Sequence, residues 1–339
     1  MNIQENISLK PFNTFGIEAT AKYFIEITSI EELKALLKTA IFSTNERLIL
    51  GGGSNILLTK DFDGIVVKIA IKGIEIVKNT PEEVLIKAYS GEVWHDLVLY
   101  CVNKNIKGGI ENLSLIPGCV GASPMQNIGA YGVEIKDIFY ELEALHISSG
   151  EIQKFNLTQC EFGYRESVFK RKLKGQYIIL AVTYVLNQQK ELNLSYGAIG
   201  ETITNAGIQD ITVKTVSDTV IQIRQSKLPN PAEIGNAGSF FKNPEIPTSQ
   251  FENLKQQYPT LPAYPTKEGF TKIPAGWLIE QAGWKGKVIG NTGVHKNQAL
   301  VLVNYGQATG NEIKNLAFEV IASVKEKYGI ELENEVNFV

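Results

Sequence analysis

Long apolar runs, a strong excess of charge and paired cysteines are all missing from this sequence of 339 residues. No run of about 18 apolar residues occurs, so the sequence contains no candidate membrane span. The segment Met1 to Phe15 has no apolar stretch behind a basic start, so we expect no signal peptide. The net charge of -3 and the pI near 5.8 exclude a general attraction to nucleic acid or to anionic membranes. Any bound phosphate must therefore be held by local groups.

Cysteine and histidine are both scarce. The three cysteines (Cys101, Cys119 and Cys160) form no C-x-x-C pair, which argues against a disulfide framework or a zinc site. This use of cysteine favours a reducing compartment, and we expect a cytoplasmic protein. His95, His146 and His295 lie outside the motifs described below and are expected to be structural.

The composition is that of a soluble globular protein, with 44% hydrophobic and 20% charged residues, and the length favours two or three domains. Ser29 and Glu32 form a capping-box pattern before an apolar helical face of Leu33, Leu36, Leu37 and Ala40, and Thr309 and Glu312 form another before the helix around Leu316. One further helix is predicted to be capped by Ser90 and to be stopped by Gly108-Gly109. Two more helices are predicted over 217–227 and over 275–282. Strands are predicted at 23–27, 48–50, 65–69, 142–147, 177–186 and 299–304. The segment 187–210 reads as a polar connection, and 245–310 as an α+β domain.

A first glycine loop, Gly51-Gly52-Gly53-Ser54-Asn55, directly follows the strand Leu48–Leu50. It is not a Walker A loop, because no Gly-Lys-Ser/Thr follows. It is a poor dinucleotide fingerprint, because Ile56 stands where the last glycine should be. An anion nest suited to a pyrophosphate and a plain glycine turn both remain open at this point.

A second stretch of small residues runs from Pro117 to Gly132 with four glycines and almost no charge. Such a stretch suits backbone lying flat against a large ligand, and two such loops suggest a clamped dinucleotide. Arg165, between Tyr164 and Glu166, is either an anion clamp or an ordinary surface arginine beside a tyrosine.

A third motif, Gly235 to Pro244, combines two glycines with Ser239, two phenylalanines, Lys242 and Asn243. A hairpin turn before a strand explains the glycines, whereas a turn that presents a reacting hydroxyl explains Ser239 as well. The tail 331–339 alternates acidic and apolar residues, as an edge strand would.

Six motifs, taken in order along the chain, resemble the UDP-N-acetylenolpyruvoylglucosamine reductase (UDP-N-acetylmuramate dehydrogenase) family. They are Leu9-Lys10-Pro11-Phe12-Asn13-Thr14-Phe15-Gly16, the two glycine stretches, Tyr164-Arg165, the Ser239 motif and Leu332-Glu333-Asn334-Glu335-Val336. The resemblance covers nearly the whole chain. The Tyr196-Gly197 segment and the stretch 258–276 are similar to the longer branch of that family, in which a tyrosine loop folds over the substrate.

The resemblance implies an α+β fold, with two α/β FAD-binding subdomains of the vanillyl-alcohol-oxidase/PCMH type and a third, α+β, substrate-binding domain. The subdomains would span 1–70 and 71–215, the substrate-binding domain 216–325, and a tail, 326–339, would carry Glu335 to the active site. It also implies a monomeric cytoplasmic enzyme of bacterial peptidoglycan synthesis, acting on a UDP-sugar with FAD and NADPH. Because the first glycine loop holds neither His nor Cys, FAD should be noncovalent.

The reaction implied by the resemblance is reduction of an enolpyruvyl ether to a lactyl ether. Arg165 would hold the conjugated carboxylate and stabilise charge developing there. Ser239 would protonate the carbon next to the one that accepts hydride. Glu335 would stabilise the enolic intermediate, as a donor if burial raised its pKa.

Residues that bind the ligands are carried over in the same way. Those for FAD are Gly51, Gly52, Gly53, Ser54, Asn55, Gly118, Gly121, Ala122, Ser123, Pro124, Gly129 and Ala130. Those for the substrate are Tyr196, Lys227, Asn243, Tyr264, Lys272 and Gln298. Asn334 stands where the family can have proline, and the chain ends soon after Glu335, which leaves the packing of this end open.

Two other functions compete with this interpretation. One is an oxidase of the same flavin superfamily, acting on sugars or hydroxy acids. The other is a nonenzymatic protein that binds a nucleotide sugar or stores flavin.

Overall fold

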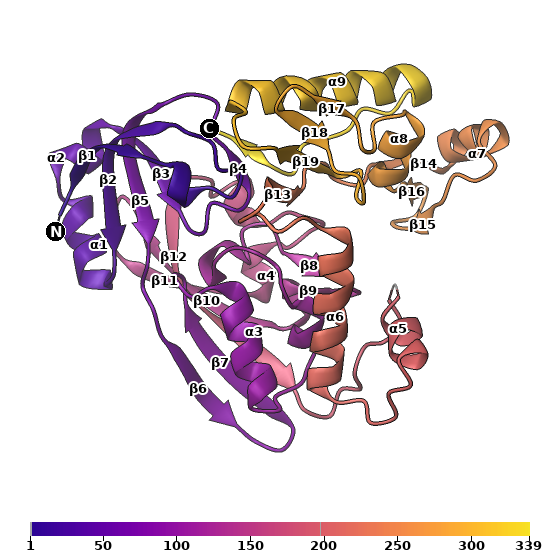
Figure 1. The fold of residues 1–339 in the computed structure, drawn as a ribbon. Helices are drawn as coiled ribbons and strands as arrows, with labels where there is room; N and C mark the ends of the chain where they lie inside the picture. Colours follow the sequence, from indigo (N-terminus) through magenta and orange to yellow (C-terminus); the bar gives the residue numbers. More distant parts are fainter. Residues whose placement is uncertain (1, 197) are drawn as a thin grey trace. The chain divides into compact units, whose positions relative to one another are not determined.

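The structure, a computed structural model, describes residues 2–196 and 198–339 (Figure 1). The chain folds into two compact units, and the chain passes between them several times. Unit 1 comprises residues up to 7, 21–52 and 62–225, and unit 2 comprises residues 8–20, 53–61 and 226–339. The predicted boundaries of three domains stay a prediction.

The first sheet of unit 1 has the strand order β1-β2-β5-β3. Its strands are β1 (Gln4–Ser8), β2 (Thr20–Ile27), β5 (Phe62–Ile69) and β3 (Glu46–Leu50). β5 pairs in parallel with both β2 and β3, and the helix α1 (Ile30–Leu37) packs Leu33 and Leu36 on the buried strand residues. Ser29 caps α1 as predicted, but the helix ends before Ala40. Ala40 instead begins a separate helix, α2 (Ala40–Thr44), because Thr39 supplies a new cap.

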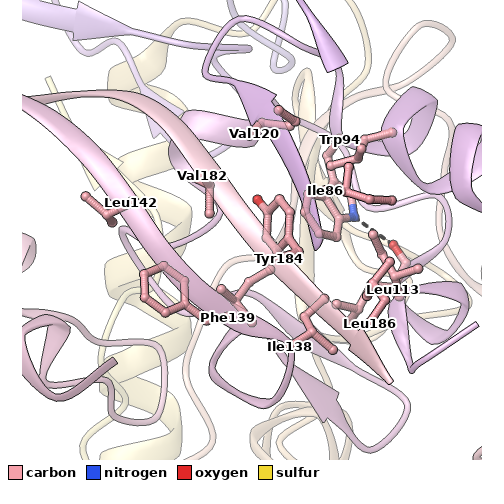
Figure 2. Close-up of a cluster of buried hydrophobic side chains, with 14 of the residues drawn as sticks. Ile86, Trp94, Leu113, Val120, Ile138, Phe139, Leu142, Val182, Tyr184 and Leu186 are labelled. Atoms are coloured by element: carbon pink, nitrogen blue, oxygen red, sulfur yellow. Dashed lines mark hydrogen bonds between the residues drawn. The ribbon is translucent and has the colours of Figure 1, made fainter. Parts of the chain in front are cut away.

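The second sheet of unit 1 has the order β11-β10-β12-β7-β6, and all its neighbouring strands are antiparallel. Its strands are β11 (Ile152–Asn156), β10 (Phe139–His146), β12 (Tyr177–Asn187), β7 (Glu83–Tyr89) and β6 (Ile74–Asn79). Figure 2 shows part of its core, where Trp94 donates its indole N–H to the carbonyl oxygen of Leu113 across 2.9 Å. Short elements complete this region: β8 (Gly129–Ala130), β9 (Val133–Glu134) and α4 (Leu157–Cys160).

The helix α3 (Trp94–Asn103) packs on this sheet through Leu97, Val98 and Cys101. Both of its predicted ends are wrong. Val93, not Ser90, is the N-cap residue. The helix also ends well before Gly108, because Asn105 takes the left-handed conformation (φ 56°) and Ile106 N–H reaches back to the carbonyl of Cys101.

The connection predicted over 187–210 contains a helix, α5 (Ile199–Asn205). It packs Ile199 and Ile203 against α6 (Val213–Lys227), which begins earlier than predicted. The apolar positions of α5 are too few to stand out from a polar sequence.

Unit 2 contains a sheet of order β13-β19-β18-β17, with α9 (Gly310–Tyr328) beside it. The Thr309 and Glu312 capping box is present, and the buried face of α9 includes Leu316. The strands are β13 (Gly235–Ser239), β19 (Val301–Asn304), β18 (Thr292–Val294) and β17 (Val288–Ile289). The motif expected to be a turn is therefore a strand, interrupted by a bulge between Asn236 and Ser239 where Gly238 has φ 69°.

Two smaller sheets complete unit 2. One has the order β14-β16-β15, and the other joins β20 at the end of the chain to β4. The remaining elements are β14 (Glu245–Pro247), α7 (Thr248–Gln257), β15 (Tyr264–Pro265), β16 (Phe270–Lys272), α8 (Ala275–Gln281), β4 (Ile56–Leu57) and β20 (Asn337–Phe338). None of the helices described is long and apolar enough to cross a membrane.

Candidate functional site

The two glycine stretches meet in unit 1. A Cβ on Gly52 would lie 2.9 Å from the Cα of Gly118, and one on Gly51 would lie 3.5 Å from the Cβ of Cys119. The first distance is shorter than real side chains allow, so the two backbones approach this closely only because residue 52 is glycine. The backbones of the two stretches are therefore in contact, while the dinucleotide clamped between them stays a prediction.

The rest of the second stretch contacts Ser90, directly after β7, and Tyr184 of β12. A Cβ on Gly121 would lie 2.5 Å from the Cβ of Ser90, and Gly121 N–H donates to the Ser90 carbonyl. The hydroxyls of Ser123 and Tyr184 are hydrogen-bonded across 2.8 Å in the core. These contacts hold the backbone of the second stretch close to its neighbours.

Arg165 lies beside the end of the second stretch. It has the left-handed backbone conformation (φ 54°), which is uncommon for a side chain of this size. Its Nη2 donates to the carbonyl of Gly129 across 2.9 Å, and its guanidinium lies 5.2 Å from the centre of the Tyr164 ring. Asn127 supports the turn by donating to the Gly163 carbonyl. The hydrogen bond to Gly129 thus holds the guanidinium against the second stretch.

The N-terminal motif 9–16 supports two of the functional segments of unit 2. Asn13 is buried and bonds to Leu9 and Ile17, which fixes the loop. The carbonyl oxygen of Phe12 would lie 2.0 Å from a Cβ on Gly53, and that of Phe15 would lie 2.1 Å from one on Gly235. Both glycines are required by this close approach, so the motif has a positioning role.

Ser239 ends β13, and the tail of the chain lies across from the residues that follow it. Glu335 N–H donates to the Phe240 carbonyl across 2.8 Å, and Lys242 N–H donates to the Glu333 carbonyl across 2.9 Å. On its other side the tail is tied to the first glycine loop, because Asn55 Nδ2 donates to the Glu335 carbonyl across 3.2 Å. The structure therefore brings Ser239, Glu335 and Asn55 into one neighbourhood. No local signal in the sequence predicts these pairings.

Asn243 and Gln298 are both found around the first turn of α8. Asn243 Oδ1 accepts the N–H of Ala275 across 2.9 Å, and a Cβ on Gly276 would lie 3.4 Å from Oε1 of Gln298. The two residues, far apart in the sequence, thus approach the same helix end.

Tyr264 and Lys272 are neighbours in the three-stranded sheet of unit 2, and a residue that sequence reasoning missed completes their row. Lys272 pairs with Tyr264 on one side and with Glu245 on the other. The Nζ of Lys272 lies 3.3 Å from Oε1 of Glu245, and Thr266 Oγ1 donates to the same oxygen across 2.9 Å. Because the strand pairing brings Glu245 here, no short motif could have marked it.

The other predicted substrate residues are more exposed. Lys227 is the last residue of α6, and the neighbouring Ser226 accepts a hydrogen bond from Asn297. In unit 1, Tyr196 is 54% exposed and its ring packs edge-on against that of Tyr131, at 6.5 Å between centres. Gly197, the other residue of the tyrosine-loop motif, lies outside the described residues.

His95 and the three cysteines are part of the core or bonded to the backbone. His95 accepts the N–H of Leu115, and burial lowers its pKa. Burial raises the pKa of the Cys101 and Cys160 thiols to about 12 and also raises that of Cys119, so these thiols are protonated near neutral pH. Among the residues that the structure describes, no group of three or more His, Cys, Asp or Glu could hold a metal ion.

Comparison with known proteins accounts for nearly the whole chain. Residues 21–156 match the family described as FAD binding domain, and residues 230–339 match the C-terminal domain of UDP-N-acetylenolpyruvoylglucosamine reductase. The UDP-N-acetylenolpyruvoylglucosamine reductases of Flavobacterium johnsoniae and Amoebophilus asiaticus are 53% and 52% identical to this chain. Both alignments cover 100% of this chain and 100% of the relative. The crystal structure of the reductase from Thermus caldophilus aligns with 100% of this chain and 99% of its own, at a TM-score of 0.67 and 22% identity.

These matches confirm the predicted α+β fold, with an FAD-binding part of the vanillyl-alcohol-oxidase/PCMH type and a C-terminal domain, and they support FAD as the cofactor. They also confirm that the chain is an oxidoreductase. Because these two relatives are more than 50% identical to this chain over its full length, the chain belongs to the UDP-N-acetylenolpyruvoylglucosamine reductase family.

Proposed function

We propose that this protein reduces the enolpyruvyl ether of UDP-N-acetylglucosamine enolpyruvate to UDP-N-acetylmuramate, a step of peptidoglycan precursor synthesis. The family membership and the FAD-binding match support this function. The observation that carries it is the association, within unit 2, of Ser239, the backbone of Glu335 and Asn55 of the first glycine loop. A hydroxyl, a carboxyl group and a predicted flavin loop are the groups that this reduction needs in one place.

The residues of the glycine stretches fit an FAD. Gly52 and Gly121 lie where a side chain would collide with a neighbouring segment, so the loops can pack this closely only with glycine at these positions. We expect these residues, with Gly51, Gly53, Ser54, Asn55, Gly118, Ala122, Ser123, Pro124, Gly129 and Ala130, to hold the cofactor. Bound FAD, once reduced by NADPH, would supply the hydride for the vinyl carbon. The protonated thiol of Cys119 beside Gly51 supports noncovalent attachment, because a thiol is a far weaker nucleophile than a thiolate.

Arg165 is the proposed clamp for the substrate carboxylate. The alkene is electrophilic through its conjugated carboxylate, so a cation there stabilises charge as hydride arrives. The bond to the Gly129 carbonyl fixes the guanidinium, and a fixed planar fork can orient the carboxylate at two points.

Ser239 is the proposed proton donor, and Glu335 the proposed second acid. A serine hydroxyl is a weak acid, so it transfers a proton only to a strongly basic carbon held within hydrogen-bond distance. The bulge before Ser239 and the pairing of the next residues with the tail restrict where its hydroxyl can point. Glu335 would stabilise the negative charge of the enolic intermediate.

The sugar nucleotide would be held by the remaining predicted residues. Lys272, Tyr264 and Lys227 would contact the diphosphate and nearby groups. Asn243 and Gln298, at the end of α8, would bond to the sugar nucleotide, and Tyr196 would close over it. These residues give local positive charge and hydrogen bonds to a protein with a net charge of -3.

Anaerobic spectroscopy tests this function against the two alternatives. We expect the purified protein to be yellow, to be bleached by NADPH under argon, and to regain its colour when the enolpyruvyl sugar nucleotide is added. Rapid turnover with oxygen and a sugar donor would instead identify an oxidase. Binding without turnover would identify a storage or carrier protein.

Three further points belong to this proposal. NADPH rather than NADH is the proposed reductant, and a comparison of the two rates of bleaching tests it. A monomer is proposed, which light scattering of the holoprotein checks. The cytoplasm is the proposed compartment, because the proposed reductant and substrate are made there.

A further inference from the structure

The carboxylate of Glu245 gathers several groups of unit 2 around it. Thr266 Oγ1 donates to it across 2.9 Å, Lys272 Nζ lies at 3.3 Å, and Lys267 Nζ lies at 3.9 Å. Glu245 lies in β14, Lys272 lies in β16, and Thr266 and Lys267 lie in the turn between β15 and β16, so one carboxylate joins two strands and this turn.

This ion pair is more enclosed than the ordinary surface pairs of unit 2. The side chains of Lys272 and Glu245 are 21% and 26% exposed, whereas those of Lys325 and Glu331 are 60% and 66% exposed. A partly enclosed pair is screened less by water and salt, so its charges influence a nearby ligand more strongly.

The row Glu245, Lys272 and Tyr264 places an acid next to two residues predicted to contact a diphosphate. A phosphate and a carboxylate compete for the same ammonium donor, since both are oxygen anions that accept from it. Glu245 therefore occupies, on Lys272, a position that a phosphate oxygen can also use.

We propose that Glu245 is the counter-ion of the substrate-diphosphate site. It holds Lys272 and the 266–269 turn in place while the site is empty, and it gives up part of its contact with Lys272 when the two phosphates of a nucleoside diphosphate bind. Glu245 is thus a positioning residue that weakens diphosphate binding in exchange for a preformed site. This inference rests on the proposed function, because it takes the ligand to be a nucleoside diphosphate sugar.

Binding of UDP to the oxidised holoprotein, measured by calorimetry, tests the proposal without any turnover. Glu245→Gln keeps an oxygen that can accept from Thr266 but removes the negative charge. We expect the Kd for UDP to fall by about threefold to tenfold, with a stronger dependence on salt. Glu280→Gln, which breaks the more exposed pair of Glu280 and Lys285, should leave the Kd unchanged.

Two further measurements separate competition from a general change of structure. In a Lys272→Met background, the gain from Glu245→Gln should shrink, because the carboxylate can then no longer withhold the Lys272 ammonium and keeps only the more distant, more exposed Lys267. Uridine, which has no phosphate, should bind the variant and the wild type equally. NADPH should bleach the flavin of Glu245→Gln at the wild-type rate.

An unchanged or raised Kd for UDP in Glu245→Gln would overturn the inference, and so would an equal gain with uridine. A wild-type holoprotein that binds neither UDP nor the enolpyruvyl sugar nucleotide would instead overturn the proposed function. The two failures are therefore distinguishable from the wild-type titration alone.

Discussion

Glu335 donates its backbone N–H to the carbonyl oxygen of Phe240 across 2.8 Å, and Phe240 directly follows Ser239. This backbone hydrogen bond links two segments that lie nearly a hundred positions apart in the sequence. The isolated bridge between Phe241 and Asn334 and the bond from Lys242 to Glu333 extend the same pairing. A displacement of the tail would therefore be transmitted to Ser239.

The first prediction concerns Ser239→Ala. If Ser239 is the proton donor, this variant should keep its FAD and be bleached by NADPH at the wild-type rate. Its reoxidation by the enolpyruvyl substrate should slow by about 10²–10⁴-fold, the usual contribution of a positioned acid. Stopped-flow absorbance separates the two half-reactions. Ser43→Ala, at an exposed position of α2, is the control, and equal reoxidation rates in the two variants would refute the role of Ser239.

The second prediction compares two glycines of the same strand. Gly235→Ala places a methyl group about where the Phe15 carbonyl now lies, at 2.1 Å, so the backbone must move. In Gly238→Ala the added methyl group has no atom within 4 Å, so the only cost is the strain of holding alanine at a φ of 69°. We expect Gly238→Ala to lower the free energy of unfolding by about 1 kcal/mol and Gly235→Ala to lower it by more, about 2 kcal/mol or above.

Chemical denaturation followed by circular dichroism measures both values. The reverse order of stability would mean that the N-terminal motif does not constrain Gly235.

The third prediction concerns the contact between the glycine loops. Gly52→Ala should reduce the affinity for FAD by about tenfold or more, or about 1.4 kcal/mol, because the added methyl would press on Gly118 and part the loops. The amount of flavin that remains bound after dialysis, and its rebinding measured by fluorescence quenching, report this change. Gly150→Ala, where the added methyl group meets no atom within 4 Å, is the control for an alanine placed away from the two loops. Full FAD affinity in Gly52→Ala would show that this contact does not shape the cofactor site.

The fourth prediction follows from the buried thiols. The pKa of Cys160 rises from 9.0 to about 12 on folding, so the native state keeps its proton where the unfolded state loses it. The resulting stabilisation is complete below about pH 9 and is lost as the pH rises toward 12. One such thiol contributes at most about 1.4 kcal/mol per pH unit within this range.

Urea unfolding at pH 8, 9, 10 and 11 gives the slope. Cys160→Ala should lower stability at every pH, through the cavity it leaves, yet show a shallower alkaline decline than the wild type. Parallel curves for the two proteins would contradict the shift. A thiol reagent at pH 8 should also react with Cys160 only after unfolding.

Local patterns identified the longer strands β2, β5, β10 and β12 and the starts of the capped helices α1 and α9. Thr309 and Glu312 mark the start of α9 because a capping box involves residues only three apart, and the apolar spacing behind it identifies the buried face. The same local reasoning failed at α3, where a serine that could cap lies before the helix instead of at its start, and at α5, which has few apolar positions.

The sequence by itself determined the family, the glycine-rich loops and the candidate residues Arg165, Ser239 and Glu335, because each of these depends on residue types in a short stretch. Only the tertiary structure decided that the Ser239 motif is a bulged strand, that the 9–16 motif supports Gly53 and Gly235, and that Glu245 pairs with Lys272. Each of these depends on hydrogen bonds or close approaches between distant segments. Strand pairing and backbone contact carry no local signature, so they appear only once the chain is folded.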